Sequence, residues 1–443
     1  MSTGLASGRI DEDLVRDALG DLDDWSPSKR SQPLVIYYVT AHGWGHLTRS
    51  VAITFELLCQ RSLVLLCTTI PQDAVRAQLA RLAEAYAVQR FDTETLSALL
   101  DQVRVRCIQL DVGCIQINAL AIDAAATLAA YTDIEQHRTE LVQREASFLR
   151  LLRPQLLLTD AVTLAAVAAK EVALADRFLF VTNFFFSAIY AGFIKADPAL
   201  DTPRYRALIQ RMVADEALAA AWVQLTPGIV PSLEPFPGDV FAVPPVSRPW
   251  KHSRQETRDS LGINADTMLL LVCFGSFDCK ALFGNADALL RPFLENVDLV
   301  RTANSPWVIV VLVEGLSEAS SPRVRLVDST DHGYVPDLVR AADVVLGKLG
   351  YGICAECLAA GTPLVYVRRP IFVEEDFLRA DLSMFSAELS TKELLSGQWA
   401  RAVQQALKLK NFANVNARPV ENPMEGLQQL ATLLQKKMQQ CMH

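Results

Sequence analysis

The feature that most limits what this chain can fold into is an alternation of short apolar runs with helical stretches, which starts twice. The first run, Leu34 to Thr40, is rich in β-branched and aromatic residues and leads into a glycine-containing turn and an amphipathic helix. The second, Thr267 to Phe274, leads into a turn at Gly275. Uninterrupted apolar runs indicate strands buried on both faces, as parallel sheets require. We therefore predict an α/β protein with two doubly wound, Rossmann-like halves facing each other across a cleft.

The expected elements follow this alternation in each half. The first half is predicted to hold strands at 34–40, 63–69, 103–108, 155–160 and 178–182, and helices at 47–58, 71–86 and 119–152, with further helical segments to about 224. The second half is predicted to hold strands at 267–274, 307–313, 343–346 and 362–367, and helices at 276–300, 335–342, 353–360, 392–407 and 424–438.

A proline-rich segment separates the two series. Seven of the 21 prolines fall between Thr226 and Pro249, where they disfavour helices and central strands. We interpret this segment as an interdomain connection. A length of 443 residues also exceeds one ordinary core. The predicted organisation is a polar, acidic tail at 1–32, a first domain at 33–235 and a second at 236–443, which includes the terminal helices.

Composition narrows the classes of function. The net charge of −8 argues against nucleic acid or an anionic membrane as the main partner. The acidic start of the chain lacks the apolar core of a secretory signal, and charged residues interrupt the most apolar stretch, Leu156 to Phe193, so that no membrane span is expected. Nine scattered cysteines suit reduced thiols in the cytoplasm. The pair Cys354 and Cys357 falls in a predicted helix without a second pair, which does not favour a metal site.

Candidate site residues of the first half follow two of its strands, where doubly wound sheets bind ligands. The turn after the first strand holds His42, Gly43, Gly45 and His46, and its glycines allow the backbone to approach a ligand closely. A neutral His46 imidazole can take a proton from a sugar hydroxyl, or it simply hydrogen-bonds a nearby carbonyl. Asp160, at the end of a later strand, either orients that histidine or caps a helix.

In the second half, Gly275 and Ser276 follow the first strand and form either an anion site at a helix start or a plain turn. The turn with Gly350 and Gly352 opens a helix and suits the close approach of a diphosphate. Glu356, one turn into this helix, can accept hydrogen bonds from ribose hydroxyls, although a glutamate there is also favoured by the helix dipole. The order of residues is not that of a nucleotide-binding P-loop.

The charged cluster Arg368 to Asp376 follows the next predicted strand. Glu374 and Glu375 offer acceptors for sugar hydroxyls, and Arg368 and Arg369 can pair with phosphate or with those carboxylates. A solvated charged loop is the alternative. Outside the acidic tail there is no convincing pair of aspartates for a metal-bound diphosphate, so neither a metal nor a cofactor is expected.

Several stretches of this chain resemble a known family. They are YYVTAHGWGHLTRS, LDVGCIQINALAIDAAATLAAY, VTNFFFSAIYAGF, the segment from TPGIVP to VPPV, and VLGKLGYGICAECLAAGTPLVYVRRPIFVEEDFLR, between about Pro33 and Arg379. They resemble the glycosyltransferase-like N-terminal half of plant-type L-arabinokinases and, more distantly, the MurG and UDP-glycosyltransferase group. The resemblance implies the GT-B architecture. No kinase phosphate loop follows Arg379, so the resemblance does not imply sugar phosphorylation.

The resemblance also implies roles for individual residues. His46 matches the general base of inverting members, and Asp160 matches the aspartate that pairs with it. Glu356 matches the glutamate that holds the nucleotide ribose. The remaining matches concern the donor: Gly275 and Ser276 fall at the diphosphate loop, where the relatives have two glycines, and Glu374 and Glu375 fall where donor-sugar hydroxyls are held.

The expected activity is an inverting, metal-independent transfer of a sugar from a nucleotide-diphosphate sugar, such as a UDP-sugar, to a hydroxyl acceptor. One alternative is a non-catalytic protein that binds sugar nucleotides for regulation. Another is an epimerase of the related two-domain fold, which would need further acid–base carboxylates in the cleft.

Overall fold

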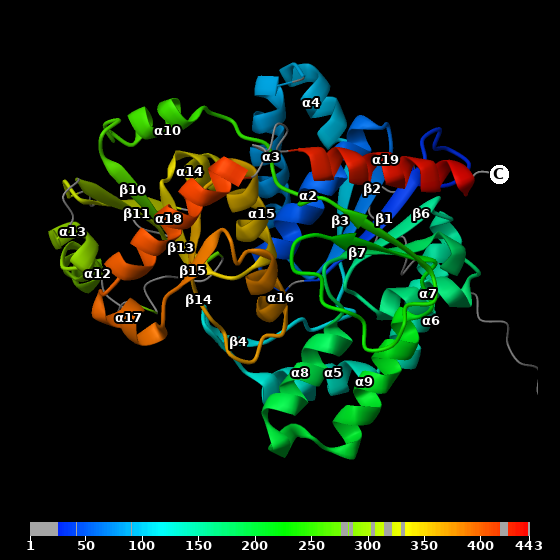
Figure 1. Cartoon of the computed structure of the whole chain (residues 1–443). Coiled ribbons are helices and arrows are strands. Elements are labelled where there is room, and N and C mark those ends of the chain that lie inside the picture. Colours follow the sequence, from blue (N-terminus) through cyan, green and yellow to red (C-terminus); the bar gives the residue numbers. More distant parts are fainter. Residues whose placement is uncertain are drawn as a thin grey trace, which may run out of the picture.

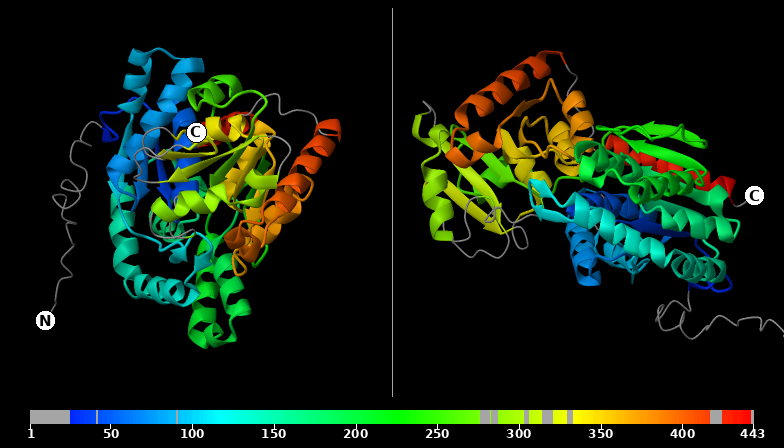
Figure 2. Two further views of the ribbon diagram at one scale, coloured as in Figure 1. Left: turned by 90° about the vertical axis from the view of Figure 1, so that its left-hand side faces the viewer. Right: turned by 90° about the horizontal axis from the view of Figure 1, so that it is seen from below.

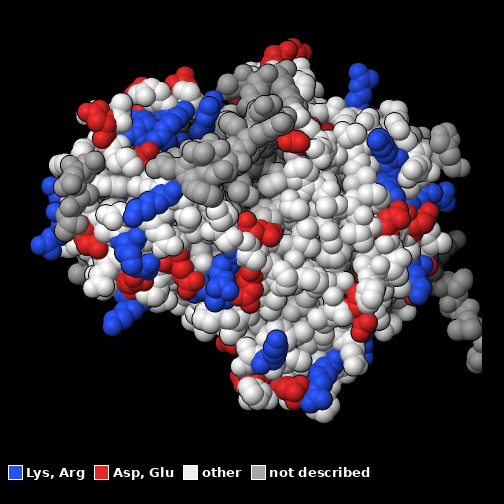
Figure 3. Space-filling model, in the orientation of Figure 1, with Lys and Arg blue, Asp and Glu red and all other residues white. Residues whose placement is uncertain are grey.

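The structure, a computed structural model, describes residues 25–40, 42–89, 91–275, 282, 287–302, 306–313, 321–328, 333–416 and 424–441. It contains two large parallel β-sheets, each with helices on both of its faces (Figure 1). This arrangement confirms the prediction of two Rossmann-like halves. On the face seen in Figure 3, Lys and Arg side chains are interspersed with Asp and Glu side chains, and no area of one sign dominates.

The first sheet has seven parallel strands in the order β3-β2-β1-β6-β7-β8-β9. They are β1 (Leu34–Val39), β2 (Leu63–Thr68), β3 (Val103–Cys107), β6 (Leu156–Asp160), β7 (Phe178–Thr182), β8 (Ala221–Leu225) and β9 (Asp239–Val243). The strand order reverses at β1, which lies between β2 and β6. The carboxyl ends of β1 and β6 therefore form a switch point, the place where doubly wound sheets bind ligands.

The second sheet has six parallel strands in the order β12-β11-β10-β13-β14-β15. They are β10 (Met268–Cys273), β11 (Trp307–Val313), β12 (Val324–Asp328), β13 (Val344–Lys348), β14 (Leu364–Val367) and β15 (Ser386–Glu388). Here the order reverses at β10, so the second switch point lies at the carboxyl ends of β10 and β13.

Helices cover both faces of each sheet. Those of the first half are α2 (Trp44–Cys59), α3 (Gln72–Gln89), α4 (Thr93–Leu100), α5 (Ala124–Gln136), α6 (Arg138–Leu152), α7 (Leu164–Glu171), α8 (Phe186–Ala196) and α9 (Pro203–Glu216). Alternate residues of a strand point to opposite faces. Val35 and Tyr37 of β1 accordingly belong to one apolar cluster, and Ile36 and Tyr38 belong to another. Burial on both faces explains why this strand is an uninterrupted apolar run.

The second half is built in the same way. Its helices are α10 (Arg254–Ser260), α12 (Asp287–Glu295), α13 (Asp298–Thr302), α14 (Val335–Ala341), α15 (Tyr351–Ala360), α16 (Glu374–Asp381), α17 (Thr391–Ser396) and α18 (Ala400–Asn416). Leu270 and Val272 of β10 face one apolar cluster, and Leu269 and Leu271 face another.

The C-terminal helix α19 (Glu425–Gln440) returns to the first half. Its residues Leu427, Leu430 and Leu434 belong to the apolar cluster that contains β1. Figure 2 shows this red helix within the first half, apart from the orange helices of the second. The first sheet also ends in β9, which lies inside the proline-rich segment and beyond residue 235. The first half therefore includes residues from both sides of the domain boundary predicted at residue 235.

Several local predictions were wrong. The helix expected at 119–152 begins instead with a two-stranded hairpin, β4 (Gln116–Asn118) and β5 (Ala121–Ile122), and continues as α5 and α6. The reason is local: the Asn118 side chain accepts a hydrogen bond from the Leu120 amide, and Asp123 accepts one from the Ala126 amide and caps α5. The strands β9, β12 and β15 and the helices α4, α10 and α16 were not predicted, and the strand β8 lies where helical segments were expected to continue to about residue 224.

Candidate functional site

A cavity of about 540 Å³ lies between the two halves, at both switch points. Among the residues that line it are these predicted ones: His42, Gly43, Gly45, His46, Gly275, Gly350, Gly352, Glu356 and Glu374. Asp160 is buried directly behind His46. Glu375 does not line the cavity, and Ser276 lies outside the described residues. The fold therefore gathers most of the predicted site around one cleft.

The turn after β1 delivers His46 to the cleft. Gly43, the residue before α2, has φ of 77° and ψ of 170°, a backbone conformation that favours glycine. Among the described residues no side chain caps this helix, and its first residues, Trp44 and Gly45, line the cavity. The side chain of His46 is 8% exposed and its ring lies edge-on against Phe184. The turn thus places a buried imidazole beside a helix N-terminus.

His46 shares Asp160 with an arginine that the sequence analysis missed. The Nδ1 atom of His46 lies 3.1 Å from Asp160 Oδ2. Arg49, one turn further along α2, donates to both oxygens of the same carboxylate, from Nε at 2.7 Å and from Nη2 at 2.6 Å. Burial alone would raise the pKa of Asp160, but the charges of Arg49 and His46 lower it below its ordinary value. Asp160 is therefore an ionised carboxylate at neutral pH.

His42 is held differently from His46. The Cys114 amide donates to its Nδ1 at 2.9 Å, so the proton of the neutral ring lies on Nε2. Its ring stacks on Phe372 of the second half at 5.6 Å. Burial lowers the pKa of His42 well below its ordinary value, and the neighbouring His46, Arg369 and Lys348 act in the same direction. His42 is thus a neutral hydrogen-bond donor and not a base.

The second half presents a second helix N-terminus to the cavity. Helix α15 begins after Gly350 without a side-chain cap. A Cβ atom at Gly352 would lie 3.9 Å from the Gly45 Cα atom, so the first turns of α2 and α15 meet across the cleft. Gly275, after β10, has φ of 79°, which favours glycine. Two converging helix N-termini and close backbone approach favour an anionic ligand.

Three cations surround this point. Lys348 ends β13 and is half-buried; the loss of solvent around it and the neighbouring Arg369 lower its pKa well below the ordinary lysine value. Arg369 lines the cavity, and its Nε donates to Glu375 at 2.6 Å. Arg248, from the connection between the halves, also lines the cavity. A ligand with two or more negative charges would relieve the mutual repulsion of Lys348 and Arg369.

The glutamates of the second half have separate environments. Arg248 Nη2 lies 2.6 Å from Glu356 Oε1, and burial raises the pKa of Glu356 although Arg248 opposes this. Glu374 accepts a hydrogen bond from Asn183 Nδ2 of the first half at 2.7 Å. Glu375 does not line the cavity, and its carboxylate accepts hydrogen bonds from the backbone amide and the Nε of Arg369. Glu356 and Glu374 are therefore positioned to meet a ligand, and Glu375 supports Arg369.

Sequence reasoning missed Arg49, Asn183, Arg248 and Lys348. Arg49 had a usable signal, because it lies three residues after His46 and so on the same face of a helix. Lys348 precedes Gly350 and Gly352 in the glycine-rich turn, and its place in the sequence does not match that of the lysine in a P-loop. Asn183 and Arg248 lie far from the other site residues along the chain, and nothing in their local sequence indicates the cleft.

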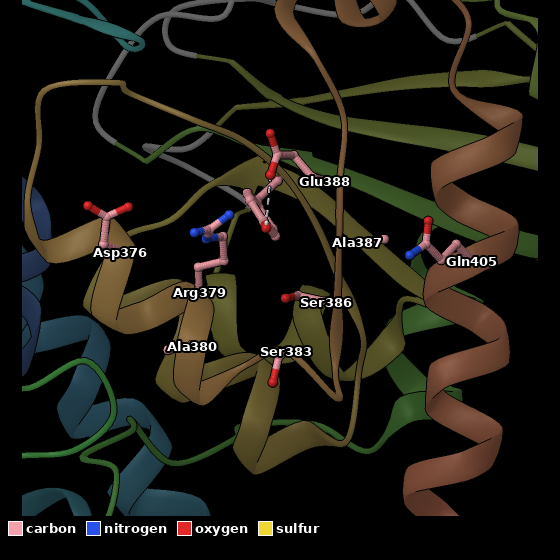
Figure 4. A pocket seen from close by; sticks show the side chains of 9 residues that line it. Asp376, Arg379, Ala380, Ser383, Ser386, Ala387, Glu388 and Gln405 are labelled. Atoms are coloured by element: carbon pink, nitrogen blue, oxygen red, sulfur yellow. Dashed lines mark hydrogen bonds between the residues drawn. The ribbon is translucent and has the colours of Figure 1, made fainter.

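A second hollow of about 380 Å³ lies on the second half, between α16, β15 and α18 (Figure 4). It is lined by Asp376, Arg379, Ser386 and Glu388, among others, and contains none of the predicted site residues. Within the ranges that the structure describes, no group of three or more His, Cys, Asp and Glu side chains is arranged to hold a metal ion. In the same ranges, no helix combines the length and the apolar character needed to cross a bilayer.

Comparison with known proteins agrees with the resemblance seen in the sequence. The chain is 31% identical over 387 residues to L-arabinokinase of Arabidopsis thaliana, which is 86% of this chain. It covers only 33% of that protein's length, so it corresponds to one part of this relative. The predicted resemblance to L-arabinokinases is confirmed. No known protein family has a model that matches the chain.

Solved structures establish the fold. The calicheamicin glycosyltransferase CalG4 superposes with a TM-score of 0.59 over 93% of this chain and 99% of its own, at 15% identity. Phytolacca americana UGT2, solved with UDP-2-fluoro-glucose and pterostilbene, has a TM-score of 0.54 over 91% of this chain and 99% of its own, at 14% identity. At such identity the likeness concerns the fold alone. The chain has the GT-B fold of these glycosyltransferases.

Proposed function

We propose that this protein transfers a sugar from a nucleotide-diphosphate sugar to a hydroxyl acceptor, with inversion and without a metal ion. A single observation carries the proposal. The His46 imidazole of the first half and the cation-flanked N-terminus of α15 in the second half line the same cavity. Such a cavity brings together a base for the acceptor and an anion site for the leaving group.

The first half supplies the base. The acceptor hydroxyl enters beside α2, and His46 Nε2 removes its proton while the oxygen attacks the anomeric carbon. Asp160 lies 3.1 Å from Nδ1, where it steadies the imidazolium that forms. One displacement at the anomeric carbon, with no covalent intermediate, inverts its configuration. This mechanism uses no side chain of the protein as a nucleophile.

The second half stabilises the leaving nucleotide diphosphate. Its charge grows as the glycosidic bond breaks, and the start of α15 and Lys348, which line the cavity, would stabilise that charge. These positive groups stabilise the charge of the leaving group, as a divalent cation does in other sites. Glu356 would accept hydrogen bonds from the ribose, and Glu374 would accept them from the transferred sugar. The UDP-sugar in the similar Phytolacca structure supports a UDP-sugar as the donor.

A release assay tests this activity. UDP- and GDP-sugars are each incubated with the protein, with and without a panel of hydroxyl acceptors, and the freed nucleotide is measured. We expect slow release by hydrolysis without acceptor and faster release with a fitting one. The anomeric configuration of the product, read by NMR, should be opposite to that of the donor. Retention of configuration would contradict the proposed single displacement.

A second candidate is a binding protein that responds to sugar nucleotides without turnover. One observation favours it: Glu356 is paired with Arg248, so a ribose must share or displace an existing ion pair. The same assay separates the two functions. Tight binding of a nucleotide sugar in calorimetry, without release under any acceptor condition, would favour the binding protein.

A further inference from the structure

The environment of His46 contains more hydrogen-bond donors than a simple pair with Asp160 requires. Arg49 has five N–H donors and no acceptor. Its Nε and one Nη2 hydrogen hold Asp160, and Nη1 donates to Asn183 Oδ1 at 2.7 Å. The other Nη2 hydrogen has two acceptors within reach: His46 Nδ1 at 2.9 Å and Thr182 Oγ1 at 3.3 Å. Which of these two acceptors takes the hydrogen determines which ring nitrogen of His46 carries the proton.

The two choices correspond to different tautomers of the ring. If Arg49 donates to Nδ1, this atom must be bare, and a neutral His46 then carries its proton on Nε2. A ring in this state cannot take a proton through Nε2. If Nδ1 carries the proton, it donates to Asp160 Oδ2, and Nε2 is bare and basic. Only this second tautomer is competent for the proposed proton transfer.

Thr182 is oriented to favour the competent tautomer. This residue ends β7, and its hydroxyl hydrogen is used in a bond to the Phe184 carbonyl at 3.1 Å. The lone pairs of Oγ1 are therefore left to accept from Arg49 Nη2 at 3.3 Å. Both states use the same positions of the heavy atoms, so the change requires only that hydrogens move.

Contacts across the cleft hold the Arg49 guanidinium in place between these acceptors. Its carbon Cζ lies 4.8 Å from the centre of the Tyr351 ring, at the start of α15 in the second half. Asn183, which accepts from Nη1, donates in turn to Glu374 of the second half. Arg49 as a whole residue is 3% exposed, so its guanidinium cannot turn away into solvent.

We propose that Thr182 is a positioning residue: by accepting the second Nη2 hydrogen of Arg49, its hydroxyl keeps His46 in the tautomer with the proton on Nδ1. The other groups that face the ring are His42, at 5.7 Å between ring centres, and the side chains of Phe184 and Phe186. None of these three contacts is a hydrogen bond to Nδ1. In the described part of the chain, Arg49 and Asp160 are the recorded partners of Nδ1.

The test reads the tautomer directly. The full-length protein is labelled with ¹⁵N-histidine, and two-bond ¹H–¹⁵N spectra are recorded at about pH 8, above the ordinary imidazole pKa of about 6.5. The spectrum of His46→Gln assigns the His46 signals by their loss. His42 serves as an internal reference, because the Cys114 amide requires the proton of its ring to lie on Nε2.

Three variants separate the hydroxyl from its surroundings. Thr182→Val removes Oγ1 and should move the His46 proton from Nδ1 to Nε2, whereas Thr182→Ser keeps the hydroxyl and should retain the wild-type tautomer. Thr54→Val is the matched control: Thr54 is also a buried threonine, on α2, and its Oγ1 has no hydrogen-bond partner among the described residues. A wild-type His46 with its proton on Nε2, or an unchanged tautomer in Thr182→Val, would overturn the proposal.

The effect of Thr182 on turnover rests on the proposed function, so activity is measured separately from the tautomer of His46. Thr182→Val should lower kcat by about ten- to a hundred-fold, the equivalent of one hydrogen bond to a charged group, with the donor KM changed less than about twofold. Thr182→Ser should recover most of this loss. Absence of turnover in every protein, including the wild type, would contradict the glycosyl transfer but leave the NMR result to decide the role of Thr182. Equal kcat in Thr182→Val and Thr54→Val would overturn the positioning role.

Discussion

The two switch points of this molecule occupy the same place in two similar sheets, but their chemistry differs. At the ends of β1 and β6, the charges are balanced: Asp160 accepts two hydrogen bonds from Arg49 and lies beside His46. At the ends of β10 and β13, Arg248 and Arg369 are paired with the carboxylates of Glu356 and Glu375, and Lys348 lines the cavity near the start of α15. One topology thus supports an acid–base pair on one side and an anion site on the other.

The difference indicates how the two halves divide the work. A balanced site with a bare nitrogen moves protons without binding a charged ligand tightly. A site that presents a lysine and the N-terminus of a helix binds an anion and stabilises negative charge as it develops. Substitutions at the first switch point should therefore change kcat, and those at the second should change donor affinity. The predictions below test this division, from the largest expected effect to the smallest.

The largest effect is expected for His46→Ala. Loss of the base should lower kcat by about 10²- to 10⁴-fold, because general bases contribute that much to proton-transfer steps. The dissociation constant for UDP, measured by calorimetry, should stay within about twofold of the wild-type value. Turnover that persists at the wild-type rate would remove His46 from the mechanism, and a large loss of UDP affinity would break the proposed division between the halves.

The counterpart in the second half is Lys348→Met. Loss of the ammonium should weaken UDP binding by about ten- to a hundred-fold, the contribution of a charge-assisted hydrogen bond. The melting temperature should not fall, because the lowered pKa of Lys348 shows that the folded state disfavours this charge, and methionine is an apolar side chain of similar length. Lys437→Met is the control: this lysine pairs with Asp239 at 3.0 Å, on the outside of the first half. If both variants bind UDP equally, Lys348 does not contact the donor.

Lys348 should also make donor binding depend on pH. Its pKa is lowered by burial, so the ammonium loses its proton below the ordinary lysine range, and UDP affinity should fall as pH rises through that lowered pKa. Stability should change in the opposite direction. Between the lowered pKa and 10.5 the unfolded chain binds more protons than the folded one, so the free energy of unfolding should rise with pH.

Calorimetry and urea unfolding across this range measure the two slopes in the wild type and in two variants. Lys348→Met should lose both slopes, because no titrating group remains at this position. Lys348→Arg should keep its charge, and its UDP affinity should not depend on pH. A wild-type affinity that rises with pH would show that a different group controls donor binding.

The comparison of the two regions also explains what could be predicted from the sequence. The strands that build both switch points are buried on both faces, so each is an apolar run that is easily recognised, as in Leu34–Val39 and Met268–Cys273. The less buried β12 and the short β15 lack this signal. Strand β9 lies at the edge of its sheet, where flanking prolines are tolerated, and the same prolines concealed it.

In the site, sequence analysis identified the residues at or directly after strand ends. It missed the residues that contact them from elsewhere in the chain. His46 and Asp160 stand at strand ends, and topology brings them together. Arg49, Asn183 and Arg248 act through contacts over long distances in the chain, such as the 111 positions between Arg49 and Asp160. Glu374 and Glu375 are neighbours of the same type in the sequence, but helix α16 turns one to the cavity and the other to Arg369. Sequence alone could not separate them.

The smallest effects concern the glycines, where the two regions should behave alike. Gly43 and Gly275 both have positive φ, of 77° and 79°, so Gly43→Ala and Gly275→Ala should each lower the free energy of unfolding by about 1–3 kcal/mol. Gly45 differs: it lies inside the first turn of α2, and an added Cβ would meet nothing within 4 Å.

Gly45→Ala should therefore leave stability unchanged or raise it by about 0.5–1 kcal/mol, as expected for alanine in a helix. Urea unfolding of the three variants measures these differences. Equal stability of Gly43→Ala and Gly45→Ala would contradict the turn that delivers His46 to the cleft. Because Gly43 and Gly275 have similar φ, the same strain is expected in both alanine variants. Loss of stability in Gly43→Ala but not in Gly275→Ala would therefore show that the two switch points differ in backbone geometry as well as in charge.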